Sequence, residues 1–447
     1  MMKTKKKILL LRRLGASLCA LLCAAMLIGT LGACGAPQTP LMELDGKTLS
    51  VNIYQLLLSR VKGTLEYGGY NVNTDSFWDT VVALDSGITY DEYVRQLALV
   101  DAKHYLAASV MFDEEGLSLP EETEESIAQD IEDYIVGDAN GSKSTMNGIL
   151  SEFGANIDIL EDLYTVEAKY ALLRDHLYGK DGSKIAANVK QEYLDANAVC
   201  FRQILVRSYY YVYDTDANGD EIYYAKDEND GKSSSIAYDI KNGHTKFDEY
   251  GKVITDKNGD SIYYLADGKI AYDKENGIRS YTRDKDGNVI TKPYGEEKLK
   301  ENRELAEEIK ASVGKGDFKR FEELVAEYES AGLDEVVASD EFYFLYTTGD
   351  NDNDYLNDIA DLLAESEVGD VKFTDSDYGY NVVMKYSMPE GAFNSSDYTD
   401  WFKDFNERVI NYLFSKKCAE KAEDIVVDDE VFASVPSMKE IGTNHYY

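Results

Sequence analysis

The stretch that most constrains the fold is residues 200–206, which read Cys-Phe-Arg-Gln-Ile-Leu-Val. It is short, apolar and rich in β-prone side chains, and polar sequence bounds it, which predicts a buried strand. A second β-prone stretch covers residues 379–385. Between the two, a helical period of apolar residues runs over residues 296–328, and Gly314 and Gly316 divide it into two helices. These pieces belong together as a strand–helix–strand frame.

Composition and charge limit the classes of function. The 447 residues are enough for two or three domains, and 44% hydrophobic with 29% charged residues is a globular composition. The formal net charge of −37 makes nucleic acid an unsuitable partner. This acidity attracts basic, unfolded chain segments, or it serves solubility alone.

The N-terminus has the pattern of a targeting segment. Lysines and arginines precede an apolar stretch at residues 14–30, and Leu-Gly-Ala-Cys follows at residues 31–34. This ending resembles the bacterial lipobox, which implies removal of residues 1–33 as a signal peptide and a diacylglyceryl chain on Cys34. The predicted location is the outer face of a bacterial cell membrane, with residues 34–41 as a tether. An ordinary signal peptide and a short transmembrane anchor are the alternatives.

Two cysteines remain beyond the leader and Cys34. Cys200 lies in the predicted strand and Cys418 in a late helix, and positions this distant carry no disulfide spacing signal. Two separate buried thiols are favoured, and one disulfide in an oxidising exterior is the alternative.

Helical periodicity dominates the first half of the chain. Apolar residues recur at i, i+3 and i+4 over residues 90–108 and 157–178, among others. A late stretch, residues 401–421, shows the same pattern and predicts one more amphipathic helix. The acidic tail, residues 422–447, is expected to be loosely held.

Residues 208–295 differ from the rest, being rich in Tyr, Asp, Asn and Gly. The motif Asn-Gly-Asp-x-Ile-Tyr-Tyr occurs at residues 218–224 and again at 258–264. Asn-Gly between β-prone runs predicts β-hairpins, here with exposed Tyr faces. Residues 214–220 also suggest a calcium loop, but the twelfth position, which needs a bidentate acid, is Ala225. A plain hairpin turn is favoured there.

The order of these parts resembles that of the PrsA/SurA-type extracytoplasmic foldases, which carry a parvulin-like peptidyl-prolyl isomerase domain. The matching motifs are Ile204-Leu205-Val206, Gly316-Asp317-Phe318, Gly369-Asp370 and Gly379-Tyr380. The resemblance covers most of residues 42–206 and 296–421 and leaves the hairpin insertion outside.

The resemblance implies an α+β fold of two domains. A helical, chaperone-like domain spans residues 42–198 and is completed by residues 396–421. A parvulin-like domain spans residues 199–388, as a small antiparallel sheet with helices, and carries the β-hairpin insertion 208–295.

The resemblance also assigns site residues. In the family, two histidines face each other across the sheet, and here their positions hold Gln203 and Asn381. The two positions of the proline-ring cup fall on Tyr355 and Ile359 when aligned from Gly369. Gln and Asn can hydrogen-bond each other but do not reproduce histidine chemistry. Since the enzyme acts by binding the twisted amide best, the substitutions imply weak or absent isomerase activity.

The sequence therefore predicts a surface-anchored foldase or holdase whose partners are unfolded secreted polypeptides. An active prolyl isomerase is one alternative, and a Tyr-rich adhesion or ligand-binding lipoprotein is another. The sequence has no Walker A loop, His-Glu-x-x-His motif, paired-Cys zinc pattern or Gly-x-Ser-x-Gly elbow. No metal or cofactor is expected.

Overall fold

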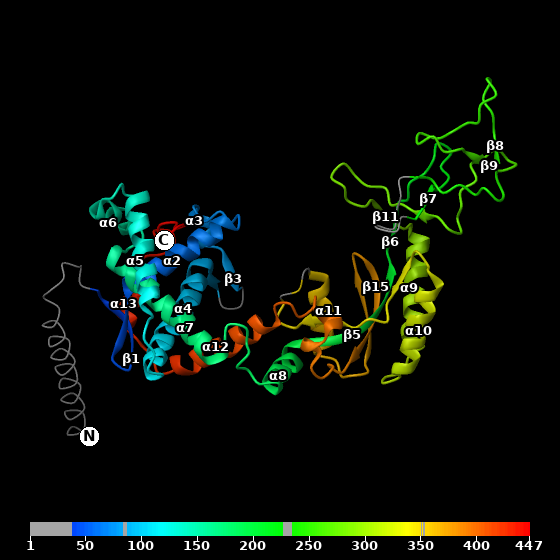
Figure 1. The fold of residues 1–447 in the computed structure, drawn as a ribbon. Coiled ribbons are helices and arrows are strands. Elements are labelled where there is room, and N and C mark those ends of the chain that lie inside the picture. The colour runs from blue at the N-terminus through cyan, green and yellow to red at the C-terminus, as the bar shows by residue number, and fades with distance from the viewer. Residues whose placement is uncertain (1–37, 84–86, 227–234, 350, 352–353) are drawn as a thin grey trace, which may run out of the picture. The chain divides into compact units, whose positions relative to one another are not determined.

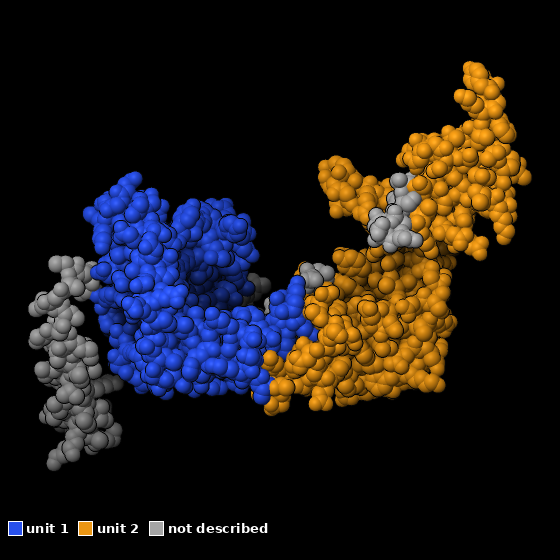
Figure 2. Space-filling view, viewed as in Figure 1, with its two compact units in different colours: residues 1–186, 402–447 blue, residues 187–401 orange. Residues whose placement is uncertain are grey.

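The computed structural model describes residues 38–83, 87–226, 235–349, 351 and 354–447 (Figure 1). The predicted leader and Cys34 lie outside the described residues. The chain divides into two compact units, here called unit 1 (Met1–Ala186 with Phe402–Tyr447) and unit 2 (Ala187–Trp401) (Figure 2). Helices and small antiparallel sheets are mixed, consistent with an α+β class. Among the helices in the described ranges, none is long and apolar enough to cross a membrane.

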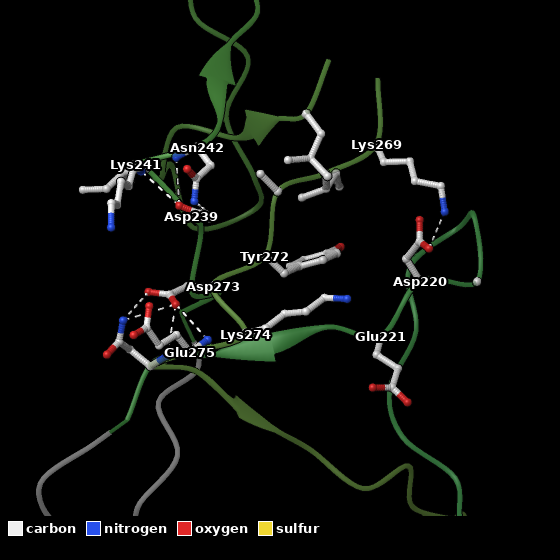
Figure 3. A pocket seen from close by; sticks show the side chains of 16 residues that line it. Asp220, Glu221, Asp239, Lys241, Asn242, Lys269, Tyr272, Asp273, Lys274 and Glu275 are labelled. Carbon is white, nitrogen blue, oxygen red and sulfur yellow. Dashed lines mark hydrogen bonds and ion pairs between the residues drawn. The ribbon is translucent and has the colours of Figure 1, made fainter. Parts of the chain in front are cut away.

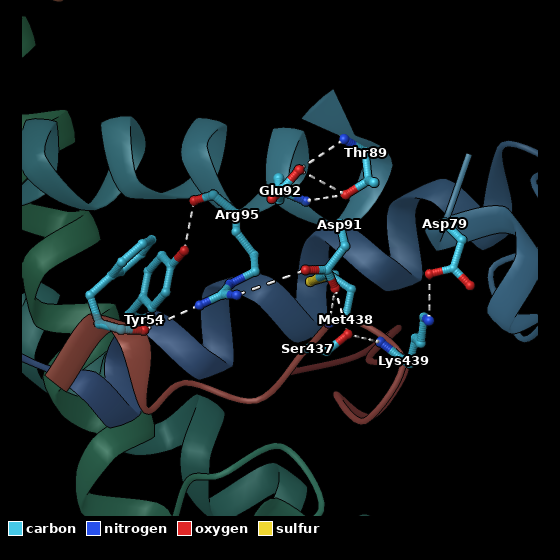
Figure 4. Close-up of polar contacts among 10 residues, drawn as sticks. Tyr54, Asp79, Thr89, Asp91, Glu92, Arg95, Ser437, Met438 and Lys439 are labelled. Atoms are coloured by element: carbon cyan, nitrogen blue, oxygen red, sulfur yellow. Dashed lines mark hydrogen bonds and ion pairs between the residues drawn. The ribbon is translucent and has the colours of Figure 1, made fainter. Parts of the chain in front are cut away.

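Unit 1 is mainly helical. Its helices are α2 (Val51–Tyr67), α3 (Asp75–Trp78), α4 (Tyr90–Glu114), α5 (Glu121–Gly137), α6 (Lys143–Ser151), α7 (Ile157–Tyr178), α12 (Phe405–Ala422) and α13 (Asp429–Ala433). Local sequence sets several helix starts, since Ser50 and Asn156 each cap a helix by accepting a backbone N–H bond. Thr89 and Glu92 form a reciprocal capping box at the start of α4 (Figure 4). The structure confirms the helices predicted from the periodic stretches, and these caps help to set where the helices begin.

The C-terminal segment is part of the core of unit 1, so the loosely held tail expected from sequence is wrong. Strand β16 (Val426–Val427) pairs with β1 (Pro40–Leu44), which also pairs with β2 (Lys47–Ser50). A short β3 (Val81–Ala83) pairs with β4 (Ile88–Thr89) elsewhere in the unit. Beyond α13 the apolar side chains of Val435, Met438 and Ile441 are buried. The acidic composition of the segment concealed these residues, whose burial supplies the stabilisation.

A buried lysine fastens this segment to α2. Lys62 is 4% exposed, and its ammonium group donates to the carbonyl oxygens of Met438 and Ile441, both at 2.7 Å. Asp91 accepts from the Ser437 hydroxyl and the Met438 amide, both at 2.6 Å (Figure 4). Burial lowers the pKa of Lys62. The carbonyl bonds offset part of the cost of burying its charge.

The C-terminal segment also passes directly over Gly63 of α2. A Cβ atom placed at Gly63 would overlap the backbone oxygen of Asn444. Only glycine lets the two backbones approach this closely.

Unit 2 is built on an antiparallel sheet in which β5 (Ala198–Arg207) is central. The order is β12 (Val336–Ala338), β5, β15 (Gly379–Tyr386), β14 (Val371–Ser376), and β13 (Tyr343–Tyr346) pairs with the other end of β5. The register places Val383 opposite Gln203 and Asn381 opposite Leu205. Because paired residues share a face, Gln203 and Asn381 lie diagonally on the same face.

Helices cover both faces of this sheet. Helix α11 (Asp354–Ala364) packs on the face of Gln203, where it buries Ile359 against Phe201 and Val383. Helices α9 (Glu296–Ala311) and α10 (Phe318–Ala331) lie on the other side of the strands (Figure 1). Helix α8 (Ala187–Asn197) leads into β5. The predicted strand and closing strand are confirmed, and both cysteines are free and buried, as favoured from sequence.

The insertion forms hairpins, as predicted, on a two-stranded stem of β6 (Tyr209–Tyr211) and β11 (Thr291–Pro293). Within it, β7 (Tyr223–Tyr224) pairs with β10 (Ile278–Arg279) and β8 (His244–Thr245) with β9 (Tyr263–Tyr264). The expectation of exposed Tyr faces is wrong for most of these rings. Tyr224, Tyr238 and Tyr272 are buried or half-buried, and their hydroxyls donate to aspartates.

Candidate functional site

The site residues predicted in unit 2 form one hydrogen-bonded network. Gln203 Nε2 donates to the Tyr355 hydroxyl at 3.3 Å, and that hydroxyl donates to Asn381 Oδ1 at 2.6 Å. Asn381 Nδ2 donates onward to Ser376 Oγ at 3.3 Å. Tyr355 thus bridges the two positions that the sequence resemblance paired directly.

The network carries no charge near neutral pH. Burial raises the pKa of Tyr355 to about 12, against the lowering effect of its hydrogen bonds with Gln203 and Asn381. The two amides do not titrate at all. General acid–base catalysis works best with a group whose pKa lies near the operating pH. None of Gln203, Tyr355 and Asn381 is such a group.

The predicted ring cup is closed. Ile359 is fully buried in the core between α11 and the sheet, and Asn381 is fully buried as well. The ring of Tyr378 lies over Tyr355, with ring centroids 5.1 Å apart. The substrate-contact role of Tyr355 and Ile359 stays a prediction, and for Ile359 it requires α11 to move.

A second candidate site, which sequence reasoning missed, lies in unit 1. Two adjoining cavities of about 610 and 300 Å³ share Arg60 and Thr64 of α2, and together they are called the α2 groove. The first is lined by Arg60, Gly63, Thr64, Tyr67 and Asn444–Tyr447, and the second by Leu57, Arg60, Val61, Thr64, Leu65, Ala98, Asp101, Tyr105 and Glu167. Its lining is mainly aliphatic and aromatic, with few charges.

Two of the charges in the α2 groove, those of Arg60 and Glu167, form an ion pair. The Arg60 guanidinium contacts Glu167 at 2.6 Å and lies 5.5 Å from the ring centre of Tyr164. Burial raises the pKa of Asp101, an effect that nearby His104 opposes. A weakly charged, apolar groove favours apolar segments over polar ones.

Exposed apolar side chains lie on the two helices that line the groove, α2 and α4. Tyr67 is 92% exposed, and Tyr93, Leu97 and Val100 form an exposed stripe on α4. The last three are spaced i, i+4 and i+7, on the helix that also supplies Ala98, Asp101 and Tyr105 to the groove lining. The sequence held a signal for this exposed stripe, because apolar residues of α4 recur on more than one face of the helix.

Comparisons with known proteins give weak structural likenesses. No family model and no curated protein matches the chain. The solved structure of PrsA from Bacillus subtilis is 14% identical, covering 80% of this chain and 94% of its own, with a TM-score of 0.16. The foldase protein PrsA from Streptococcus pneumoniae is 11% identical, covering 89% and 98%, with a TM-score of 0.19. TM-scores this low establish no shared function, so the sites are interpreted from their own geometry.

Proposed function

We propose that the protein is a lipid-anchored, extracytoplasmic foldase or holdase that binds unfolded secreted polypeptides in the α2 groove. The observation that supports this proposal most is the exposed apolar surface around the groove, with Tyr67 92% and Leu97 49% exposed. Exposed apolar surface of this kind marks interaction sites on soluble proteins. The net charge of −37 suits clients whose apolar segments are flanked by basic residues.

In this proposal unit 2 contributes little or no isomerase activity. The closed cup at Ile359 and the neutral bridge of Tyr355 support a structural network rather than a catalytic one. A proline-limited refolding assay tests this directly. Acceleration by catalytic amounts of the wild-type protein contradicts it, and Gln203→His with Asn381→His asks whether histidines alone restore activity.

Aggregation assays test the groove. An unfolded client is diluted into buffer and light scattering is followed with and without stoichiometric protein. We expect wild-type protein to suppress scattering, and Tyr67→Glu with Leu97→Glu to lose most suppression, because one charge then lies in the groove lining and one on the exposed apolar stripe of α4, and both disfavour apolar segments. Tyr67 is 92% and Leu97 49% exposed, so we expect the fold to tolerate both substitutions, which circular dichroism checks.

Val136→Glu is the matched control. Val136 is 58% exposed on α5 and outside the groove lining, and the substitution adds one negative charge, so it is compared with the single variant Tyr67→Glu. Equal loss from the control variant, or no suppression by the wild type, contradicts the proposal. Deletion of residues 210–293 distinguishes the foldase proposal from the adhesion alternative. Protection of the client that survives the deletion is due to the remaining chain and favours the foldase.

A further inference from the structure

The sheet of unit 2 ends on one side at β14, which pairs with β15 and, in the described part of the chain, with no other strand. The ladder between the two strands runs from Val371 to Ser376 without a shift of register. Just before it, Gly369 and Asp370 both bond to Lys385 in a bulge, and β14 itself contains no proline. Six residues of regular edge strand are a template for one further strand.

The register shows which backbone groups of β14 face outward. In an antiparallel pair, residues that exchange backbone hydrogen bonds with the partner strand alternate with residues that do not. The Asp370 carbonyl accepts from β15, so Lys372 and Thr374 are the next residues bonded to that strand. The backbone groups of Val371 and Phe373 therefore point away from β15, to the side where no described strand lies.

Solvent reaches this edge of the sheet. All six residues of β14 are half-buried or exposed, and the side chains of Lys372 and Asp375 are 37% and 50% exposed. Helices α9 and α11 pack on the two faces of the sheet, so neither takes the place of a strand at its edge.

Side chains on both faces of the sheet flank the edge. The ring of Phe373 lies on the α9 side, with its centre 6.3 Å from that of Tyr380 and 5.5 Å from the Arg303 guanidinium. Lys372 and Thr374 lie on the other face, on the side of α11. A strand added at this edge presents its side chains alternately to an aromatic surface and to a polar one.

Charge favours a basic segment over a second copy of this chain. The formal net charge is −37, so two copies repel each other. The insertion in unit 2 adds to this field, since its cavity of about 920 Å³, where three stretches between residues 219 and 276 meet, is lined by five acids and three lysines (Figure 3). Asp239 in that lining accepts from the side chain and the amide of Asn242, which lowers its pKa and keeps it ionised.

We propose that β14 binds an extended, basic segment of an unfolded polypeptide as an additional strand of the sheet. An extended polypeptide carries donors and acceptors at the two-residue repeat that Val371 and Phe373 present. Because backbone groups make the contacts, the edge accepts many sequences. The inference rests on the proposed function for the origin of this segment in an unfolded client, and it adds a binding surface in unit 2 that does not depend on the α2 groove.

Hydrogen exchange followed by NMR tests the proposal, using residues 38–447 and the peptide acetyl-Lys-Thr-Val-Thr-Val-Lys-amide. In the free protein the amides of Val371 and Phe373 should exchange faster than those of Lys372 and Thr374, which are bonded to β15. The peptide at about 1 mM should slow exchange at Val371 and Phe373 about twofold or more, which is half-saturation at that concentration. The same peptide with every backbone amide N-methylated should not, because its methyl groups block both of its edges.

Val371→Pro is the matching change in the protein. It removes one outward amide and no bond to β15, and proline is tolerated at the first residue of a strand. We expect it to weaken peptide binding about tenfold. Val371→Ala shortens the same side chain but keeps the amide, so binding should stay within twofold of wild type. If Val371→Pro does not fold, the comparison of the two peptides on the wild-type protein decides.

The α2 groove and the β14 edge are tested separately. Tyr67→Glu with Leu97→Glu alters the groove and should leave protection of the Val371 and Phe373 amides unchanged. The β14 proposal is overturned if the peptide protects neither amide, if the methylated peptide protects them equally, or if Val371→Ala weakens binding as much as Val371→Pro. Protection that rises with protein concentration in the absence of peptide also overturns it, since the edge then pairs with a second copy.

Discussion

Tyr355 donates a hydrogen bond of 2.6 Å to the side-chain oxygen of Asn381, which joins α11 to the centre of the sheet in unit 2. Asn381 is fully buried, so it has no access to water if this donor is lost. The bond therefore stabilises unit 2. The sequence alone predicts a catalytic position at Asn381 and not this structural role.

Replacing the bridge tests this role. We expect Tyr355→Phe to lower the free energy of unfolding of unit 2 by about 1–3 kcal/mol, since it leaves Asn381 Oδ1 buried without a donor. Hydrogen exchange of the β5 and β15 amides measures it. Tyr378→Phe, whose side chain is 44% exposed, is the control and should change protection little. Unchanged exchange in Tyr355→Phe contradicts the bridging role.

The contact of the C-terminal segment with α2 gives a second prediction. Gly63→Ala places a methyl group against the Asn444 backbone, so the segment must shift, and we expect a loss of several kcal/mol, on the order of 2–4, in unit 1. Urea unfolding followed by fluorescence of Trp78 measures it, in a Trp401→Phe background that leaves one tryptophan.

The control for this glycine lies in another helix. Gly148 is inside α6, and an added Cβ there meets nothing within 4 Å. Gly148→Ala should stabilise unit 1 by roughly 0.5–1 kcal/mol through helix propensity. Similar effects of both substitutions would show that the segment does not press on α2.

Alkaline pH gives a third prediction. Burial raises the pKa of Cys418 from 9.0 to about 12, so above pH 9 the folded state holds a proton that the unfolded state releases. The stability from this thiol is complete below pH 9 and is lost as pH rises from 9 to 12. With Trp78 as reporter, Cys418→Ala should reduce the decline of stability between pH 9 and 10 by up to about 1.4 kcal/mol per pH unit.

Cys200 provides the control for that measurement. Burial raises its pKa to about 12 as well, but it belongs to unit 2. Cys200→Ala should leave the pH slope reported by Trp78 unchanged. An equal change of slope in both variants contradicts assignment of the effect to one buried thiol.

The base of the insertion gives a fourth prediction. Arg279 forms two hydrogen bonds with Asp334, at 2.9 and 3.1 Å, and its guanidinium lies 4.0 Å from the ring centre of Tyr213. We expect Asp334→Asn to weaken this fastening by roughly 0.5–1 kcal/mol and to speed hydrogen exchange in β6 and β11. Asp286→Asn, which removes an exposed pair with Lys285, should have no effect on either strand. Equal rates of hydrogen exchange in β6 and β11 in the two variants would contradict the view that Asp334 holds the base of the insertion.

Much of the fold could be predicted because apolar residues recur along the chain with clear helical periodicity or in short β-prone runs. Residues 157–178 have the bounds of α7, and the strand predicted over residues 200–206 lies within β5. The prediction for the tail was wrong because its composition is acidic, whereas Val435, Met438, Ile441 and Tyr447 are buried in a core formed with helices far away in sequence. Such tertiary burial has no local signal.

The candidate sites were predictable only in part. Gln203 and Asn381 are close because the register of β5 and β15 puts them on one face, and a family pattern anticipates that register. The hydroxyl of Tyr355 between them depends on how α11 docks, which no local pattern specifies. The α2 groove and the cavity of the insertion arise where segments distant in sequence meet, so periodicity could not predict either.

The stem of the insertion has a consequence for how such a protein is assembled in evolution. Tyr209 at its start and Pro293 at its end are direct partners in the antiparallel pair of β6 and β11. The backbone of the sheet domain therefore enters and leaves the whole insertion at two adjacent points, as it would a short turn. A gene segment coding for it can be gained, exchanged or lost in one event without altering the strand register, which leaves this position free to acquire new binding specificities while the sheet domain stays the same.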